Sequence, residues 1–130
     1  MEKDFAKKNV FVTGAGKGIG KYLVVSLLDK GAYVYALTKS DKTLDDLKKN
    51  KNLKIFYGNV NNSKLIKKIF KFSEKNKKLI NSIVNNAGVR QRKKFTKISS
   101  KDLEDIFEIN FFSIFKIMQE YVLYSKKNKI

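Results

Sequence analysis

The sequence contains neither cysteine nor histidine. The absence of cysteine excludes a disulfide framework, a thiolate metal site and a cysteine nucleophile. The absence of histidine removes the commonest general base and metal ligand, so acid–base chemistry falls to tyrosine, lysine and the carboxylates. No apolar run approaches the roughly 18 residues of a membrane-spanning helix, and residues 1–4 lead into no apolar signal core. We therefore expect no membrane association and a cytoplasmic location.

Acidic residues are scarce, with 12 against 29 lysines and arginines, which leaves a formal net charge of +17. Such a charge is typical of nucleic-acid-binding proteins, and a basic nucleic-acid-binding module is one alternative. The lysines, however, are spread over the whole chain beside many Asn, Ile and Phe and no proline, a bias that an AT-rich coding sequence produces. We do not expect nucleic acid as the main partner, although the positive field favours anionic ligands in general.

What the chain does contain is a globular composition, with 42% hydrophobic residues, ten Phe and six Tyr. Its 130 residues suffice for one domain with a real core. No internal repeat or low-complexity linker divides them, so we expect a single domain over residues 1–130.

A glycine-rich stretch, Thr13–Gly20, stands between an apolar run at Val10–Val12 and a helical pattern over residues 18–30. Bare glycines permit a tight turn and the close approach of a phosphate, and a helix N-terminus favours an anion. In this strand–turn–helix order the stretch predicts a phosphate site; the alternative is a structural turn without a ligand. The helix is expected to be amphipathic, and its apolar face to carry Ile19, Leu23, Leu27 and Leu28.

Strand and helix patterns alternate along the rest of the chain. Further strands are expected at residues 33–37, 53–57 and 79–84, and helices at 42–49, from Ser63 as N-cap, and from Ser99 with Asp102 as its capping partner. This alternation indicates a parallel sheet, and right-handed crossovers build a doubly wound α/β structure. The expected strand order is 3-2-1-4. Ligands bind at the switch point between strands 1 and 4, where the glycine loop and Asn85–Gly88 both lie.

The pattern after Ser99 is that of the longest helix. Its apolar positions keep the helical period: Leu103, Ile106, Phe107, Phe111, Ile114, Phe115 and Met118. Asn110 is a polar residue on this apolar stripe, and burying its amide costs free energy unless the amide is hydrogen-bonded. It is therefore either a functional polar group or a partly exposed helix residue.

Together, these motifs strongly resemble the short-chain dehydrogenase/reductase family. The resemblance rests on T-G-x-x-x-G-x-G at Thr13–Gly20, Asn85–Gly88, the opening Lys8–Val12, and Glu108–Asn110. Within the family the chain is most similar to ketoacyl and xylulose-type carbonyl reductases. The resemblance implies a Rossmann-like sheet of seven strands, of which four are here, an NAD(P) cofactor, a small carbonyl or alcohol substrate, and a homo-oligomer when complete.

In the family's glycine motif, which here consists of Thr13, Gly14, Gly16, Lys17, Gly18, Ile19 and Gly20, the backbone holds the cofactor. Gly14 and Gly20 are expected to allow the turn and the close approach of helix and strand. Gly18 is expected to leave room for the pyrophosphate, and Ile19 to point its amide at a phosphate oxygen.

The end of the second strand indicates the choice of cofactor. An acidic residue there would hydrogen-bond the ribose 2′-hydroxyl and repel a 2′-phosphate. This chain has Thr38, Lys39 and Ser40 instead, and Lys17 in the glycine loop. We therefore expect NADP(H) rather than NAD(H). The alternative is that Lys39 is one more surface lysine.

Two further loops are predicted to contact the cofactor. Asn59 and Val60 stand where the family usually has Asp-Val, and an Asn carbonyl can also accept from the adenine amino group; the alternative is a plain Asx turn. Asn86, Ala87 and Gly88 would line the ribose and nicotinamide side with their backbone. Their alternative is a strand-ending turn held by Asn side chains.

The resemblance assigns Asn110 to the proton relay, where similar proteins use an Asn to hold a water. The family's Ser and Tyr-x-x-x-Lys are not found: Tyr121 is followed four residues on by Ser125, and Tyr124 by Asn128. Ile130 would then begin a fifth strand. We expect the chain to be the N-terminal, cofactor-binding part of a longer NADP(H)-dependent oxidoreductase; the alternative is a non-catalytic dinucleotide-binding regulatory protein.

Overall fold

The computed structural model describes residues 5–40 and 42–130, so the polar N-terminus Met1–Asp4 and Asp41 lie outside the described residues. Four strands form one parallel sheet in the order β3-β2-β1-β4. Their bounds are β1 Asn9–Thr13, β2 Tyr33–Thr38, β3 Leu53–Tyr57 and β4 Ser82–Val84. The predicted strand order and the doubly wound, Rossmann-like class are confirmed.

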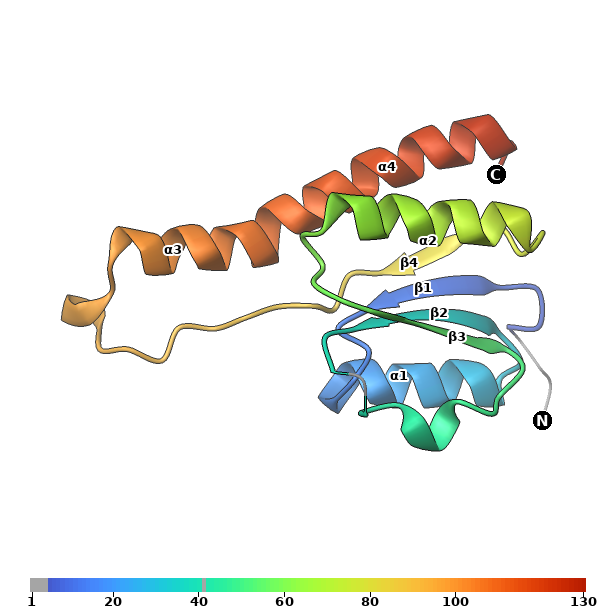
Figure 1. The fold of residues 1–130 in the computed structure, drawn as a ribbon, viewed down its shortest axis with the longest axis horizontal. Helices are drawn as coiled ribbons and strands as arrows, with labels where there is room; N and C mark the ends of the chain where they lie inside the picture. The colour runs from blue at the N-terminus through green and yellow to red at the C-terminus, as the bar shows by residue number, and fades with distance from the viewer. Residues whose placement is uncertain (1–4, 41) are drawn as a thin grey trace.

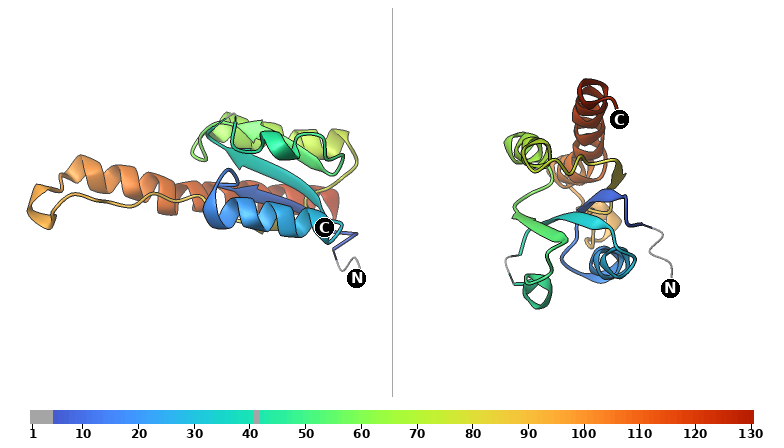
Figure 2. Two further views of the ribbon diagram at one scale, coloured as in Figure 1. Left: turned by 90° about the horizontal axis from the view of Figure 1, so that it is seen from below. Right: turned by 90° about the vertical axis from the view of Figure 1, so that its right-hand side faces the viewer.

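Helices cover both faces of this sheet (Figures 1 and 2). α1 (Gly18–Asp29) lies on one face, and α2 (Ser63–Lys75) and α4 (Ser113–Asn128) lie on the other. Because neighbouring residues of a strand point to opposite faces, β1 contributes Phe11 to one core and Val10 and Val12 to the other. Each face therefore has its own apolar cluster.

The two clusters draw on different parts of the chain. The α1 side is built from Val10, Val12, Ala15, Val24, Leu28, Ala32, Val34, Ala36 and Leu44. The α2 and α4 side is built from Phe11, Tyr35, Leu37, Phe56, Val60, Ile66, Ile69, Phe70, Ile80, Ile117 and Tyr124. Tyr124 also makes polar contacts: its hydroxyl lies 2.7 Å from the Ser73 Oγ and accepts a hydrogen bond from the Ile80 amide at 2.8 Å.

Three local predictions are corrected. Residues 42–49 do not form a helix but contain one 3-10 turn, η1 (Asp45–Leu47). The N-cap of α2 is Asn62, whose side chain accepts from the Leu65 amide, and not Ser63. In α1 the buried residues are Gly20, Val24 and Leu28, whereas Ile19 is 72% exposed. Leu28 is buried as expected, and Gly20 lies on the buried face because a Cβ there would collide with the Gly14 carbonyl.

The fourth strand begins later than expected. Residues 79–81 are not paired as strand; the Asn81 amide donates to the Asn9 carbonyl, and the Ile80 amide donates to Tyr124 instead of to a neighbouring strand. β4 pairs with β1, and no second strand adjoins it among residues 5–40 and 42–130.

The long helical segment begins as predicted. Ser99 caps α3 (Ser100–Phe107) in a full capping box with Asp102. A π-helical turn, η3 (Glu108–Phe112), joins α3 to α4. Figure 1 shows α3 and the loop before it extending beyond the sheet as an arm. In the part of the chain that is described, no helix is both long and apolar enough to span a membrane.

Much of the predicted apolar stripe on this segment is exposed rather than packed. We use the term "apolar stripe" for six residues that recur every three or four positions: Leu103, Phe107, Phe111, Phe115, Met118 and Val122. Phe107 and Phe115 are 55% and 54% exposed. The helical period was predicted correctly, but only Ile117 and Tyr124, with Ser113, are buried on α4.

Candidate functional site

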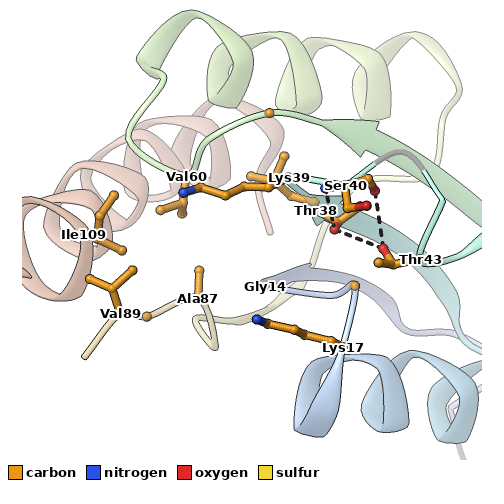
Figure 3. Close-up of a pocket in the computed structure, with 14 residues that line it drawn as sticks. Gly14, Lys17, Thr38, Lys39, Ser40, Thr43, Val60, Ala87, Val89 and Ile109 are labelled. Atoms are coloured by element: carbon orange, nitrogen blue, oxygen red, sulfur yellow. Dashed lines mark hydrogen bonds between the residues drawn. The ribbon is translucent and has the colours of Figure 1, made fainter. Parts of the chain in front are cut away.

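A cavity of about 320 Å³ lies at the carboxyl ends of the strands, beside the start of α1 (Figure 3). Fourteen residues line it: Gly14, Gly16, Lys17, Leu37, Thr38, Lys39, Ser40, Thr43, Gly58, Val60, Ala87, Gly88, Val89 and Ile109. Nine of these are predicted site residues: Gly14, Gly16, Lys17, Thr38, Lys39, Ser40, Val60, Ala87 and Gly88. The topology therefore brings four separate loops to one place.

The glycine loop after β1 has a backbone that only glycine adopts readily. Gly14 has φ +62° and Gly18 has φ +52°, both in the left-handed region. A Cβ at Gly20 would come within 2.1 Å of the Gly14 carbonyl oxygen, so the helix approaches the loop too closely for any side chain. A Cβ at Gly18 would meet nothing within 4 Å, so this position faces open space.

Gly16 faces the end of β2. A Cβ there would lie 2.2 Å from the Thr38 Oγ1 and 2.5 Å from the Thr43 Oγ1. The two hydroxyl oxygens are 3.4 Å apart, and the Ser40 amide donates to the Thr38 hydroxyl at 3.3 Å. Glycine at position 16 therefore lets the first loop lie directly on the hydroxyl-rich end of β2.

Thr13 and Asn86 join the first and last loops of the site rather than lining its cavity. The buried Thr13 hydroxyl accepts hydrogen bonds from the Asn86 and Ala87 amides at 3.1 and 3.0 Å. The Asn86 side chain donates to the Thr13 and Gly14 carbonyls at 3.3 and 3.1 Å. Thus an Asn side chain does hold the turn after β4, and that turn forms one wall of the cavity.

Two lysines supply the charge of the site. Lys17 and Lys39 line the cavity, and Figure 3 shows their side chains extending across it from opposite sides. Among residues 5–40 and 42–130, no aspartate or glutamate belongs to the lining. The cavity is therefore electropositive and suited to an anion.

Three other predicted residues lie outside the lining. Gly18 begins α1, and Ile19 points into solvent, so only its backbone remains a candidate contact. Asn59 is exposed, and its carbonyl accepts from the Asn62 amide at 3.1 Å. That main-chain bond closes a short turn before α2.

Asn110 is exposed at the π-helical turn, rather than buried in the stripe. Its side-chain oxygen accepts from the Val89 amide at 2.8 Å, and its side-chain nitrogen donates to the Val89 carbonyl at 2.7 Å. Both polar ends of the amide are thus satisfied by one residue of the cavity lining. The contact fixes the loop after β4 against the helical segment.

Five lining residues were not predicted: Leu37, Thr43, Gly58, Val89 and Ile109. For Thr43 the sequence offers a weak signal, a hydroxyl five residues beyond Thr38. Lys21 of α1 holds this segment in place, because its ammonium group donates to the Thr43 carbonyl at 2.9 Å and to Asp46 at 3.0 Å. The Lys21 hydrogen bond also lowers the pKa of Asp46 below its ordinary value.

The arrangement suits an elongated phosphate-bearing ligand. The glycine loop leaves open backbone at the start of a helix, which favours a phosphate. Hydroxyls and lysines follow at the end of β2, and an apolar end is formed by Ala87, Val89 and Ile109 (Figure 3). These are the requirements of a nicotinamide dinucleotide, with its pyrophosphate, ribose and ring portions.

Comparisons with known proteins identify relatives that belong to one family of dehydrogenases and reductases. The "short chain dehydrogenase" family profile matches residues 8–129. An uncharacterised oxidoreductase of Saccharomyces cerevisiae is 33% identical over 116 residues, which covers 85% of this chain and 46% of that protein. L-xylulose reductase of Caenorhabditis elegans is 32% identical over 114 residues, with 82% and 43% covered.

Solved structures show the same fold. A short-chain dehydrogenase of Leptospira borgpetersenii with bound NAD⁺ matches with a TM-score of 0.83 at 27% identity, over 95% of this chain and 48% of that one. A short-chain dehydrogenase of Bacillus anthracis matches with a TM-score of 0.88 at 20% identity, over 96% and 54%, and supports the fold alone. The chain spans about half the length of the curated relatives it matches. By its sequence and its fold, the chain belongs to the short-chain dehydrogenase/reductase family.

Proposed function

We propose that this chain is the cofactor-binding part of an NADP(H)-dependent oxidoreductase that acts on a small carbonyl or alcohol compound. The observation that carries the proposal is the cavity between the glycine loop and the end of β2, with Lys17 and Lys39 over it. Family membership supports a nicotinamide dinucleotide as the ligand. A cytoplasmic location and a homo-oligomer are part of the same proposal.

Each loop of the site has a role in this proposal. Amides of Gly16–Ile19 at the start of α1 hold the pyrophosphate, because backbone N–H groups and the helix dipole converge there. Thr38, Ser40 and Thr43 present hydroxyls to the adenosine ribose. Val60 covers the adenine, and Ala87 and Gly88 line the nicotinamide side.

The 2′-phosphate is assigned to the two lysines. Lys39 and Lys17 reach the cavity from different loops, so a doubly charged phosphate between them gains two ammonium partners. NAD(H) has a neutral hydroxyl there, which can accept a hydrogen bond but forms no ion pair with either lysine. This difference is the physical reason for preferring NADP(H).

The bound nicotinamide supplies or accepts a hydride, a chemistry that belongs to the cofactor. This chain's own contribution is to bind and orient the dinucleotide. Asn110 keeps Val89 at the nicotinamide side, and its proposed part in the proton relay is to hold a water near that end. Its two bonds to Val89 use one acceptor and one donor of the amide, so the second donor and second acceptor site of the amide remain for water.

A fluorescence titration tests the cofactor. We expect NADPH to bind the full chain at least about tenfold more tightly than NADH, which corresponds to one charge-assisted contact. Lys39→Gln is expected to remove most of that difference. Lys68→Gln, which removes a charge from the exposed side of α2, is the matched control and should leave it unchanged. Equal or tighter binding of NADH by the unaltered chain would refute the NADP(H) assignment.

A further inference from the structure

Arg90, one of the two arginines of the chain, directly follows a residue that lines the cavity, and Arg92 lies two residues further along the same loop. The chain has 29 lysines and arginines, and only Arg90 and Arg92 are arginines. They follow Val89, which lines the apolar end of the cavity, so the Cα of Arg90 is about 3.8 Å from that of Val89. Arginine presents a rigid planar fork that binds a carboxylate or phosphate through two parallel hydrogen bonds, which lysine cannot do.

The backbone around the two arginines is held at three points. Val89 is bound at both its amide and its carbonyl by Asn110. The Gln91 side chain accepts from the Arg92 and Lys93 amides at 2.8 and 2.9 Å. Lys93 then donates to both carboxylate oxygens of Asp102 at 2.7 Å. This anchoring reduces the entropic cost of ordering the segment around a ligand.

The side chains of the two arginines, in contrast, have no acidic partner among residues 5–40 and 42–130. The ion pairs that these residues form all involve lysines, and the lysine that follows Arg92, Lys93, pairs with Asp102 of α3. Arg90 and Arg92 are both exposed. Within the described part of the chain, two unpaired guanidinium groups thus extend from an anchored loop that starts at Val89, at the apolar end of the site.

We propose that Arg90 and Arg92 bind an anionic group of the substrate, so that the substrate class is a carbonyl or alcohol compound bearing a carboxylate or a phosphate. The proposal rests on the proposed function, because it is that function which makes the Val89 end of the cavity the reacting end. The lysines over the cavity are assigned to the cofactor, which leaves the arginines to the substrate. They thereby set the preference for charged over neutral carbonyl compounds.

Because the chain has only two arginines, each proposed contact can be followed separately by NMR. Its NMR spectrum holds two Arg Nε–H signals, one for each proposed contact. With the chain saturated by NADPH, levulinate is titrated against its neutral methyl ester, and dihydroxyacetone phosphate against dihydroxyacetone. We expect the anion of at least one pair to shift both Nε–H signals and to bind about tenfold more tightly than its neutral partner, the size expected for a charge-assisted hydrogen bond. The pair that responds distinguishes carboxylate from phosphate.

The double variant Arg90→Gln/Arg92→Gln should abolish this preference and leave the affinity for NADPH unchanged. The control Lys94→Gln/Lys97→Gln removes the same charge from the same loop, farther along the chain, and should retain at least half of the preference. Equal binding of anion and neutral partner in both pairs, or an equal loss in both double variants, overturns the proposal. The separate NADPH titration reports on the proposed function, so the two failures are distinguishable.

Discussion

Gly16 shows how one missing side chain brings two loops together. We expect Gly16→Ala to push the Thr38 and Thr43 hydroxyls out of place, because the added Cβ would lie 2.2 and 2.5 Å from them. Overpacking of this kind costs about 1–3 kcal/mol of stability. The affinity for NADPH, measured by fluorescence titration, should fall at least about tenfold. Urea unfolding of the same variant measures the loss of stability.

A double-mutant cycle separates the steric effect from other causes. In a chain that already carries Thr38→Ala and Thr43→Ala, the added methyl group of Gly16→Ala meets neither hydroxyl oxygen, so its cost in free energy of unfolding should be smaller. An equal cost in both backgrounds would show that the contact at position 16 is not the cause.

Asp102 makes the start of α3 sensitive to pH. Its pKa is held well below the ordinary value, first by the hydrogen bond from Lys93 and then by the backbone and side chain of Ser99. A lowered folded-state pKa contributes stability that is present above the unfolded value of about 3.9 and is lost as the pH falls through the folded value. In a ¹³C titration of the carboxyl carbon, Lys93→Gln should raise the pKa of Asp102 more than Ser99→Ala. The reverse order would contradict the assigned causes.

At the scale of elements, the connection from β2 to β3 departs most from its predicted structure. Leu44 and Leu47 suggested a weak helix, but Leu44 is fully buried and Lys21 holds the Thr43 carbonyl and Asp46. These tertiary contacts override a local propensity that is weak in itself. By contrast, the Ser99–Asp102 capping box was predictable because all of its partners lie within four residues.

Lys21 also matters for ligand binding, because it holds the part of the β2–β3 connection that lines the cavity. Lys21→Met should loosen the chain around Thr43 and weaken NADPH binding several-fold, because Thr43 and Ser40 line the cavity. Asp46→Asn is the matched variant: it weakens the ion pair and leaves the Thr43 contact, so its effect should be smaller. Amide hydrogen exchange across residues 42–48 should rise in the first variant. Unchanged exchange there would exclude Lys21 as the anchor.

At the scale of the whole molecule, the apolar stripe is the largest departure from an ordinary soluble surface. Contiguous exposed apolar patches of this kind mark interaction surfaces, and this one runs along α3, η3 and α4. We expect the chain to self-associate with rising concentration in sedimentation velocity. Phe107→Ser/Phe115→Ser should lower that association without unfolding the sheet. Tyr22→Ser on α1, also an exposed aromatic residue, is the control and should have no effect.

The sheet order and the place of the cavity could be predicted because both follow from local patterns and general rules of handedness. The glycine loop and Asn85–Gly88 are separated by some 65 residues, yet parallel strands place them at one edge. Thr43, Val89 and Ile109 were missed because they reach the cavity through tertiary contacts. Asn110 was predicted as a site residue, but its pairing with Val89, 21 residues away, is a tertiary contact that no local pattern indicates.

The make-up of the two apolar clusters sets the order in which the two faces of the sheet can pack during synthesis. The buried members of the α1-side cluster all come from residues 10–44. The opposite cluster needs Ile117 and Tyr124, near the end of the chain. As the chain emerges from a ribosome, the α1 side of the sheet can therefore pack first, whereas the opposite cluster is completed only about 80 residues later. During that interval α2 can already cover Phe11 and Tyr35 through Phe70 and Phe72, but the places of Ile117 and Tyr124 in the cluster stay open.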